Sequence, residues 1–506
     1  GPRGAGGKRP MPQAQNLLPA GAVLIFPASI SFGDGVGSVP GQAEAVPTPQ
    51  PLRESTIRLD PAWTEALMAF DPDTERFCGG DGAASCPLPG GRTLWLFGDS
   101  CIAAVVDGRY QPGWWMTNNV VAVTVDPPRG EAPAPGSAVA RFGDRPEPGE
   151  PSGFVVPPAG GRARWSWPCD GAIVVGPAGE ERLLIFYGDL ARRVDEPAPG
   201  EVWNFKFVGN RVAIIENPSE APKAWRVVQH ALEPRDSGRM KDGAPTISWG
   251  VVVMRDPESS GDRLVIFGVD GSNPFNKQAV VARVQVAKAH DFSEWRFWTG
   301  SSWSPRESEA ATVINHVVDE FTIHHEPARG DAERGRWLLI QGEPVLGHRI
   351  LVRQAPTPLG PWSDGHPICT VPEPSNDEKL ITYGAKAHPH LSAPGELLIS
   401  YCINSLDFGS LSRDVEIYRP RFLRVPAALL HGPDRAAAGP PDSGDGRRTK
   451  SAPPPPSTDD ASTPCHLSLL NPRPFPIETR CELDFHRSQV GWRSSRTPVA
   501  RRRPRV

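Results

Sequence analysis

One hydrophobic pattern occurs five times along the chain: a run of large apolar residues that closes on a small or acidic residue. From start to start, the segments lie 90, 81, 73 and 60 residues apart. Leu, Ile, Val, Phe and Trp dominate these runs, and turn residues separate them, which is typical of short β-strands. The five segments are Thr93–Asp99, Leu183–Asp189, Leu264–Asp270, Trp337–Glu343 and Leu397–Ile403.

A second β-rich run follows each segment, and hardly any window shows a sustained helical period. Repeats of three or four strands at this spacing are typical of propeller blades, which must stack to bury their faces. We therefore predict an all-β, five-bladed β-propeller over residues 51–430; a β-sandwich or jelly roll ranks second because it leaves the repeat unexplained. The second runs are Val120–Val125, Val212–Glu216, Ala279–Val286, Arg349–Gln354 and Val415–Val425.

Composition supports many turns and few helices. The 506 residues include 51 Gly and 59 Pro, both of which interrupt helices. The formal net charge is −4, and the body of the chain carries no basic stripe of the kind that binds nucleic acid. No stretch approaches 18 uninterrupted apolar residues, so we expect no membrane span. The 15 Trp residues fit core packing or platforms for sugar rings.

Both ends of the chain differ from the body. Residues 1–50 contain an apolar run at 17–26 and then Ala43-Glu44-Ala45, which together have the form of a signal segment and its cleavage site. We therefore expect a secreted or periplasmic protein, with a disordered extension as the alternative. Residues 431–506 are rich in Pro, Ala, Gly and Ser and end in an Arg-rich sequence, which predicts a low-complexity, disordered tail.

The eight cysteines do not define a metal site. None lies in a C-x-x-C pair or near His at zinc-ligand spacing. Cys78 and Cys86 flank a Gly-rich stretch, where a disulfide and two free buried thiols are both open. We expect no cofactor, and a structural Ca²⁺ ion is the alternative use of the acidic residues discussed next.

Two aspartates stand out in the first repeat, Asp81 and Asp99. Pro89–Arg92 reads as the turn of a hairpin, and if it centres on Gly90, Asp81 and Asp99 lie opposite each other at the open end. Two carboxylates that close repel, so one pKa should rise, which allows an acid and a base to coexist at neutral pH. Glycoside hydrolysis uses such a pair. The alternatives are loop capping and cation binding.

At these residues the sequence resembles a family of five-bladed propellers long labelled as of unknown function, which includes endo-acting D-arabinan hydrolases. The resemblance rests on Gly79–Ser85 and Gly91–Ser100 and continues to Tyr418–Phe422. It implies that Asp81 and Asp99 match the family's two acidic catalytic positions. Where the family pattern leads us to expect Asn after Ser-Tyr, this chain has Cys402.

Other polar and aromatic residues near the predicted blade entrances are candidates for substrate binding. Asp170 occupies the position in the second repeat that Asp81 occupies in the first, and Glu320 precedes a predicted strand in the fourth. For His388 a structural role competes with a hydrogen bond to a sugar hydroxyl, and for the indoles core packing competes with stacking. The remaining candidates are Asn118, Trp167 and Trp249.

The pattern as a whole favours a glycoside hydrolase whose partner is a polysaccharide or oligosaccharide, with a furanose-containing, arabinan-like polymer as one candidate. A non-catalytic carbohydrate-binding propeller is the main alternative, and a protein-interaction propeller is the third. Nothing in the sequence resembles a nucleotide-binding loop, a serine nucleophile elbow or a zinc signature. The sequence does not define the oligomeric state.

Overall fold

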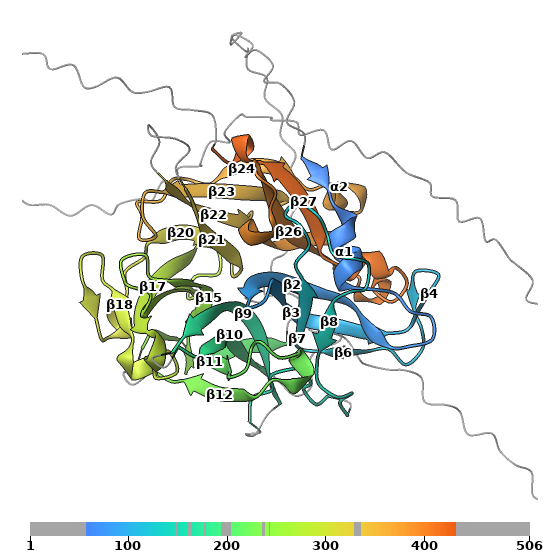
Figure 1. Ribbon diagram of the computed structural model, residues 1–506, viewed down its shortest axis with the longest axis horizontal. Coiled ribbons are helices and arrows are strands. Elements are labelled where there is room, and N and C mark those ends of the chain that lie inside the picture. Colours follow the sequence, from blue (N-terminus) through green and yellow to red (C-terminus); the bar gives the residue numbers. More distant parts are fainter. Residues whose placement is uncertain are drawn as a thin grey trace, which may run out of the picture.

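The computed structural model describes residues 57–147, 149–158, 163–176, 179–193, 204–234, 238–241, 243–327 and 335–431. In this part of the chain, five antiparallel sheets stand around a common axis (Figure 1), which confirms the predicted five-bladed β-propeller. The predicted signal-like segment lies outside the described residues, as does the predicted tail apart from His431, so both stay predictions. None of the described helices is long and apolar enough to cross a membrane.

The first two blades each contain four antiparallel strands that follow one another in chain order. The first also carries β6, which pairs with β3 beside β7. Blade one consists of β2 (Arg76–Leu88), β3 (Arg92–Ala103), β6 (Trp115–Thr117), β7 (Val120–Val125) and β8 (Val139–Arg141). Blade two consists of β9 (Arg164–Val175), β10 (Glu181–Arg192), β11 (Phe205–Ile215) and β12 (Val227–Leu232).

The next two blades repeat this order, and blade three is extended at its outer edge. Blade three consists of β15 (Ile247–Arg255), β16 (Arg263–Asp270), β17 (Lys277–Gln285), β18 (Arg296–Trp298), β19 (Trp303–Ser304) and β20 (Ile314–Val317), which pairs with β17. Blade four consists of β21 (Phe321–Glu326), β22 (Arg336–Gly342), β23 (Arg349–Ala355) and β24 (His366–Thr370).

Blade five is built from both ends of the described chain. Its outer strand β1 (Arg58–Leu59) pairs with β27, with Arg58 opposite Arg424. The blade consists of β25 (Leu380–Ala387), β26 (Glu396–Ser405), β27 (Arg421–Pro426) and β1. Outside the blades lie the hairpins β4 (Val105–Val106) to β5 (Arg109–Tyr110) and β13 (Met240–Lys241) to β14 (Ala244–Pro245), and the helices α1 (Pro61–Leu67) and α2 (Glu373–Asn376).

The repeated sequence segment is the second strand of every blade: β3, β10, β16, β22 and β26. Its apolar run is nearly continuous because each blade presses one face on each neighbour. In β10, Leu184 and Phe186 pack toward blade three, while Leu183 and Ile185 pack toward blade one. A strand that is buried on both faces has no polar alternation, which explains the pattern seen in the sequence.

Five hydrophobic clusters, one between each pair of neighbouring blades, hold the propeller together. Helix α1 adds Trp63 to the cluster between blades five and one, against Trp95 and Phe422. Representative pairs in the other four clusters are Leu94 with Ile185, Phe186 with Trp249, Phe267 with Leu339, and Ile340 with Ile399.

The structure differs from the predicted strand Val415–Val425. Residues Val415–Tyr418 form a 3-10 turn, and the strand begins only at Arg421. The carboxylate of Asp414 accepts a hydrogen bond from the Glu416 amide at 3.0 Å, which favours the turn over an extended strand. This turn places Tyr418 against the first blade.

Candidate active site

The hairpin of β2 and β3 brings Asp81 and Asp99 together as predicted. Its pairing runs from Leu88 opposite Arg92 to Gly80 opposite Ser100, the register expected for a turn around Gly90. The pairing shifts between Gly80 and Gly82, so Asp81 lies in a bulge beside Gly98 and Asp99. Bulges re-aim side chains, and this one turns a carboxylate toward the neighbouring blades.

Gly98 leaves the room that the Asp81 carboxylate occupies. A Cβ atom at position 98 would lie 2.5 Å from Oδ1 of Asp81, closer than non-bonded atoms approach. The missing side chain is therefore part of the site geometry. On the other side, Gly82 has a φ of 97°, a left-handed conformation that glycine adopts without strain.

Asp81 is buried, with an exposed fraction of 6%, and accepts two phenolic hydrogen bonds. The hydroxyls of Tyr383 and Tyr418 each donate to its Oδ2 atom at 2.9 Å. Burial raises the pKa of Asp81 to about 7, and the negative charge of Glu320 adds to the rise, while the two tyrosine hydroxyls lower it. The carboxyl therefore changes protonation state near neutral pH.

Asp99 is more deeply buried, at 2% exposure, and its two oxygens differ. Oδ1 accepts hydrogen bonds from Nε1 of Trp167 at 2.9 Å and from Nδ2 of Asn118 at 3.1 Å. Among the residues that the structure describes, Oδ2 has no hydrogen-bond partner. Burial raises the pKa of Asp99 well above its usual range, and the charge of Asp81 raises it further. A proton on Oδ2 of Asp99 would thus have no acceptor within the described part of the chain.

The expected pKa rise comes chiefly from a different cause than the sequence suggested. We predicted that repulsion between the two aspartates would raise one pKa, but burial is the larger cause for both. The neighbouring charge that acts on Asp81 belongs to Glu320, which lies in another blade. The pKa values of both carboxyls are raised, and in each case two side-chain hydrogen bonds act in the opposite direction.

A buried lysine, Lys386, interacts electrostatically with both Glu320 and Asp170. Lys386 of β25 is 3% exposed, and its Nζ atom lies 3.1 Å from Oε2 of Glu320. The carboxylate of Asp170 accepts backbone hydrogen bonds from Gly171 at 2.8 Å and Val253 at 2.9 Å. Burial raises the pKa of Asp170 to about 7, and the positive charge of Lys386 lowers it. Lys386 therefore links two of the predicted carboxylates electrostatically.

Cys402 stands where the resemblance led us to expect an asparagine. Its sulfur accepts a hydrogen bond from the Gly82 amide at 3.1 Å, next to Asp81 in the chain. The thiol thus anchors the bulge of β2 from blade five. Cys78 and Cys86 are both free and buried, so the disulfide alternative for these residues is not present.

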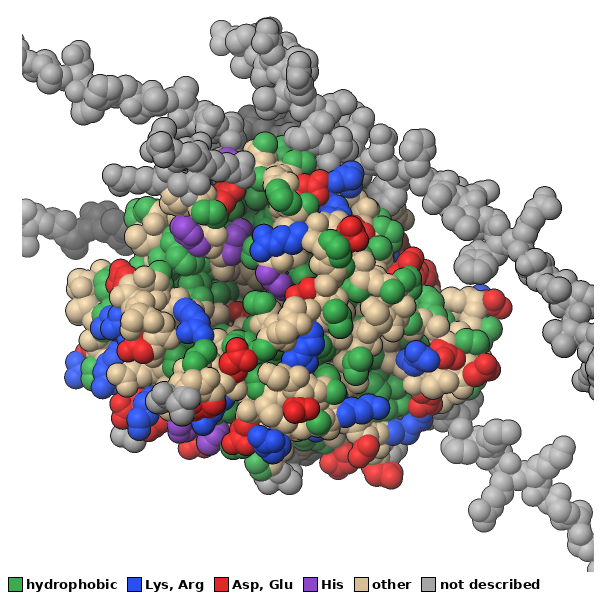
Figure 2. All heavy atoms as spheres, in the orientation of Figure 1, with side chains coloured by type: hydrophobic (Ala, Val, Ile, Leu, Met, Phe, Trp, Pro, Cys, Tyr) green, Lys and Arg blue, Asp and Glu red, His purple; other side chains and the backbone are tan. Residues whose placement is uncertain are grey.

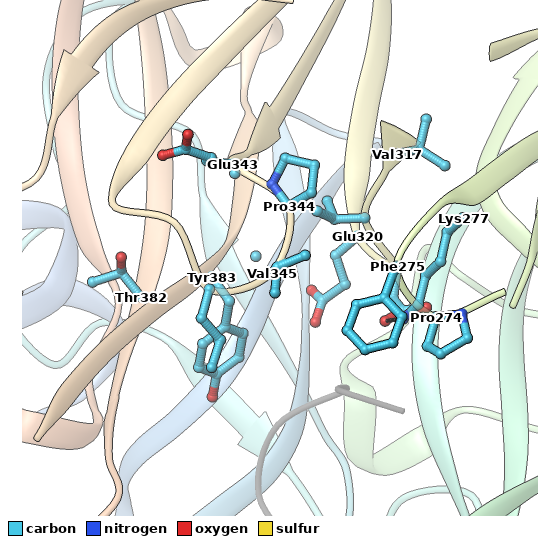
Figure 3. A pocket seen from close by; sticks show the side chains of 15 residues that line it. Pro274, Phe275, Lys277, Val317, Glu320, Glu343, Pro344, Val345, Thr382 and Tyr383 are labelled. Atoms are coloured by element: carbon cyan, nitrogen blue, oxygen red, sulfur yellow. Dashed lines mark hydrogen bonds and ion pairs between the residues drawn. The ribbon is translucent and has the colours of Figure 1, made fainter. Parts of the chain in front are cut away.

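A pocket opens beside these groups, between blades three, four and five (Figure 3). Its empty volume, including the open mouth, is about 610 Å³. Glu320 and Tyr383 form part of its wall, and behind Tyr383 lies Asp81. The pocket therefore extends to Tyr383, which contacts Asp81 directly. Neither Asp81 nor Asp99 is among its lining residues.

Two of the predicted residues have the contacts of core side chains. Trp249 is fully buried, donates to Oε1 of Glu307 at 2.6 Å and packs on Trp295. His388 is fully buried, with its ring nitrogens 2.6 Å and 2.9 Å from the hydroxyl oxygens of Ser85 and Ser400. The structural alternative that the sequence offered for both residues therefore matches their surroundings.

Sequence reasoning missed Tyr383, Tyr418 and Lys386. Tyr418 belongs to a stretch that carried the family resemblance, and tyrosine is scarce, with five in the whole chain. Neither signal points to Asp81, because both tyrosines lie more than 300 residues from it. Contacts of such separation leave no local pattern.

Within the described residues, no group of three or more His, Cys, Asp or Glu side chains is arranged to hold a metal ion. Hydroxyl, indole and amide donors surround the carboxylates of Asp81 and Asp99 instead. A Ca²⁺ ion takes oxygen lone pairs and not N–H or O–H donors. The donor set therefore fits an acid–base pair better than a cation site.

Acidic and basic side chains are interspersed over the face of the molecule shown in Figure 2, and no field of a single sign covers the described residues there. This distribution agrees with the absence of a basic stripe from the body of the sequence.

The chain belongs to the family described as a domain of unknown function (DUF5005), whose model matches residues 67–432. This confirms the resemblance to a propeller family of that kind. No curated protein sequence matches the chain.

Solved structures share the fold at low sequence identity. A protein from Bacteroides ovatus ATCC 8483 that carries a provisional assignment as a hydrolase has a TM-score of 0.52 and 17% identity, over 74% of this chain and 96% of that one. An exo-β-1,3-galactanase from Phanerochaete chrysosporium has a TM-score of 0.38 and 9% identity, over 71% and 62% of the two chains. An α-L-arabinofuranosidase from Podospora anserina has a TM-score of 0.37 and 13% identity, over 71% and 94%. The first of these likenesses supports the fold.

Proposed function

We propose that this propeller is a glycoside hydrolase that cleaves a polysaccharide, with a furanose-containing, arabinan-like polymer as the first substrate to test. The observation that carries the proposal is the unequal pair Asp81 and Asp99. Both carboxyls are buried on adjacent strands, yet one accepts two tyrosine hydroxyls and the other keeps an oxygen that has no partner among the described residues. The provisional assignment of the Bacteroides ovatus protein as a hydrolase agrees with this reaction class.

Asp99 has the environment of a general acid. Burial raises its pKa well above the usual range, which favours the protonated form. The glycosidic oxygen of a bound substrate would accept that proton as the bond to the anomeric carbon breaks. Trp167 and Asn118 hold the other carboxyl oxygen, which fixes the orientation of the acid.

Asp81 has the environment of the base or nucleophile. With a pKa of about 7, it is substantially ionised at neutral pH, and the hydroxyls of Tyr383 and Tyr418 stabilise the charged form. The carboxylate either takes a proton from a water that attacks the anomeric carbon, or attacks that carbon itself to form an ester that water then hydrolyses. The distance between the two carboxyls in the substrate complex decides between these routes.

A non-catalytic carbohydrate-binding propeller is the second candidate, and one observation favours it. Asp81 and Asp99 are 6% and 2% exposed and lie behind the wall of the pocket. In that case the pocket would bind sugar and the aspartates would only support its wall.

Hydrolysis assays on the full chain separate the two candidates. Arabinan, arabinogalactan, xylan and β-1,3-galactan would be incubated with the wild type and with the variants Asp81→Asn and Asp99→Asn. The matched control is Asp256→Asn, which neutralises a buried aspartate that pairs with Arg263 in the connection between β15 and β16. We expect each site variant to lose at least about 100-fold in rate with its fold intact, and the control to stay active. Sugar binding without hydrolysis of any polymer would establish the second candidate.

A further inference from the structure

We propose that the pocket between blades three, four and five is a glycosyl-binding subsite that accepts an uncharged sugar unit and rejects a uronate. The inference rests on the proposed function in that it treats the pocket as one arm of the same substrate cleft. The pocket combines an apolar surface at its mouth, hydrogen-bond acceptors at its base and paired charges in its walls.

The mouth of the pocket offers apolar surface on two sides. Phe275 is 48% exposed and Val345 is 52% exposed, and both line the pocket. Figure 3 shows them on opposite sides of the Glu320 carboxylate. A sugar ring has apolar C–H faces, and a flat aromatic surface beside a polar group is well suited to receive one.

The loop that carries Val345 is held in an uncommon conformation. Val345 and Leu346 have φ values of 58° and 59°, in the left-handed region that branched and bulky side chains rarely adopt. Such conformations concentrate at ligand-binding sites, where the surrounding structure maintains them. Here the conformation keeps Val345 at the mouth and lets Leu346 line the wall.

The base of the pocket presents hydrogen-bond acceptors. The Glu320 side chain is 18% exposed, and Thr382 also lines the pocket. Carboxylate oxygens accept hydrogen bonds from sugar hydroxyls, and each keeps lone pairs beyond those used by its ion pair. Gly384 leaves this side of the pocket open, since a Cβ atom there would lie 3.2 Å from Oε2 of Glu320.

Each acidic side chain of the wall has a cation beside it. Lys277 pairs with Asp319, Lys386 pairs with Glu320 at 3.1 Å, and Nε of Arg349 donates to Glu343 at 2.9 Å. The ammonium of Lys277 is the only cation among the lining residues, and it is 7% exposed. A uronate carboxylate would therefore meet three carboxylates without an uncommitted cation, and burying it there would be costly.

Tyr383 joins the subsite to the aspartate pair. The residue lines the pocket, while its hydroxyl donates to Asp81 at 2.9 Å. A sugar in the pocket is therefore separated from Asp81 by a single side chain. A unit bound here would be a neighbour of the unit whose bond is cleaved.

Equilibrium binding in the Asp99→Asn background tests the subsite apart from catalysis. Arabinotriose, xylotriose and galactotriose would be titrated against the protein by calorimetry, with trigalacturonate as the charged probe. We expect at least one neutral trisaccharide to bind, Phe275→Ala to weaken that binding about tenfold, and Phe275→Trp to retain it. The control Val228→Ala removes an exposed apolar side chain on the outer strand of blade two and should leave binding unchanged.

Three results would overturn the subsite: binding of none of the neutral trisaccharides, binding that Phe275→Ala leaves unchanged, or equal binding of trigalacturonate. The hydrolase proposal fails separately. If the wild type cleaves a polymer and Phe275→Ala leaves KM unchanged, the hydrolase stands and the subsite falls. If Phe275 controls binding but no polymer is cleaved, the subsite stands and the hydrolase falls.

Discussion

Tyr418 and Asp81 lie 337 residues apart in the chain, and the tyrosine hydroxyl donates to the aspartate Oδ2 at 2.9 Å. The contact crosses from blade five to blade one, so the last blade supports the charge on the first. Because hydrogen bonds to the ionised form lower a pKa, Tyr418 helps to keep Asp81 ionised near neutral pH.

The variant Tyr418→Phe should therefore raise the pKa of Asp81 and shift the acidic limb of the kcat/KM profile upward by about 0.5–1 pH unit. The wild-type limb is expected near pH 7, since Asp81 must be ionised to act. The measurement is kcat/KM between pH 5 and pH 9. Tyr401→Phe is the control, because that hydroxyl donates to Glu373 at 2.8 Å. An unmoved acidic limb would exclude Asp81 as the group that sets it.

The roles of acid and base can be separated with leaving groups. Asp99→Asn should lose about 10²–10⁴-fold on a polymer but far less on the 4-nitrophenyl glycoside of the same sugar, whose leaving group needs no protonation. Asp81→Asn should lose activity on both substrates. The measurement is kcat/KM for each pair of variant and substrate. The opposite pattern would assign the acid role to Asp81.

The raised pKa of Asp81 should also make the folded protein less stable as the pH rises. The folded pKa of Asp81 is about 7 against an ordinary value of 3.8. Between about pH 4 and pH 7, the unfolded chain has lost this proton while the folded protein keeps it. Stability therefore falls as the pH rises through this window, and the cost is complete above about pH 7. Relative to the wild type, Asp81→Asn should gain on the order of 1–4 kcal/mol between pH 4 and pH 8.

Denaturant unfolding of both proteins at pH 4, 6 and 8 measures this difference. A constant offset between variant and wild type across the three pH values would contradict a raised pKa at Asp81.

Gly98→Ala should lower activity without unfolding the propeller. The new methyl group would press on Oδ1 of Asp81, which must then leave its position in the bulge. We expect a loss of about 10-fold or more in kcat, because small displacements of catalytic groups are costly. Gly209→Ala is the control, since a Cβ atom at that position of β11 meets nothing within 4 Å. Equal activity of the two variants would show that Asp81 tolerates the shift.

Lys386→Met should destabilise the fold by about 3–5 kcal/mol, because it leaves the carboxylate of Glu320 without its buried partner. The double variant Lys386→Met with Glu320→Gln should regain most of this loss. Thermal melts of the two single variants and the double variant supply the comparison. Additive losses would mean that the two side chains are not coupled.

The fold and part of the candidate site could be predicted from the sequence. The five apolar runs predicted the blades, and the turn at Gly90 predicted the register that opposes Asp81 to Asp99. Both are local features, in which the side chains that specify the structure lie within about twenty residues of one another. Asn118 and Trp167 were also found, and both contact Asp99.

The remaining part depends on contacts that close only in three dimensions. Tyr383, Tyr418 and Lys386 come from the last blade and meet residues of the first and fourth. No spacing in the chain encodes such meetings. The degree of burial is equally invisible in sequence, which is why the cause of the raised pKa values was misjudged and why Trp249 and His388 turned out to have the contacts of core residues.

The pairing of β1 with β27 has a consequence for synthesis on the ribosome. Blade five needs Arg58–Leu59 from the start of the domain and Arg421–Pro426 from its end. Blades one to four can emerge and fold in order, but the propeller cannot close until residue 426 has left the exit tunnel. Because Tyr383 and Tyr418 arrive with that last blade, a nascent chain carries Asp81 without its two hydroxyl donors. Any activity of this site would therefore begin only after the whole propeller has been made.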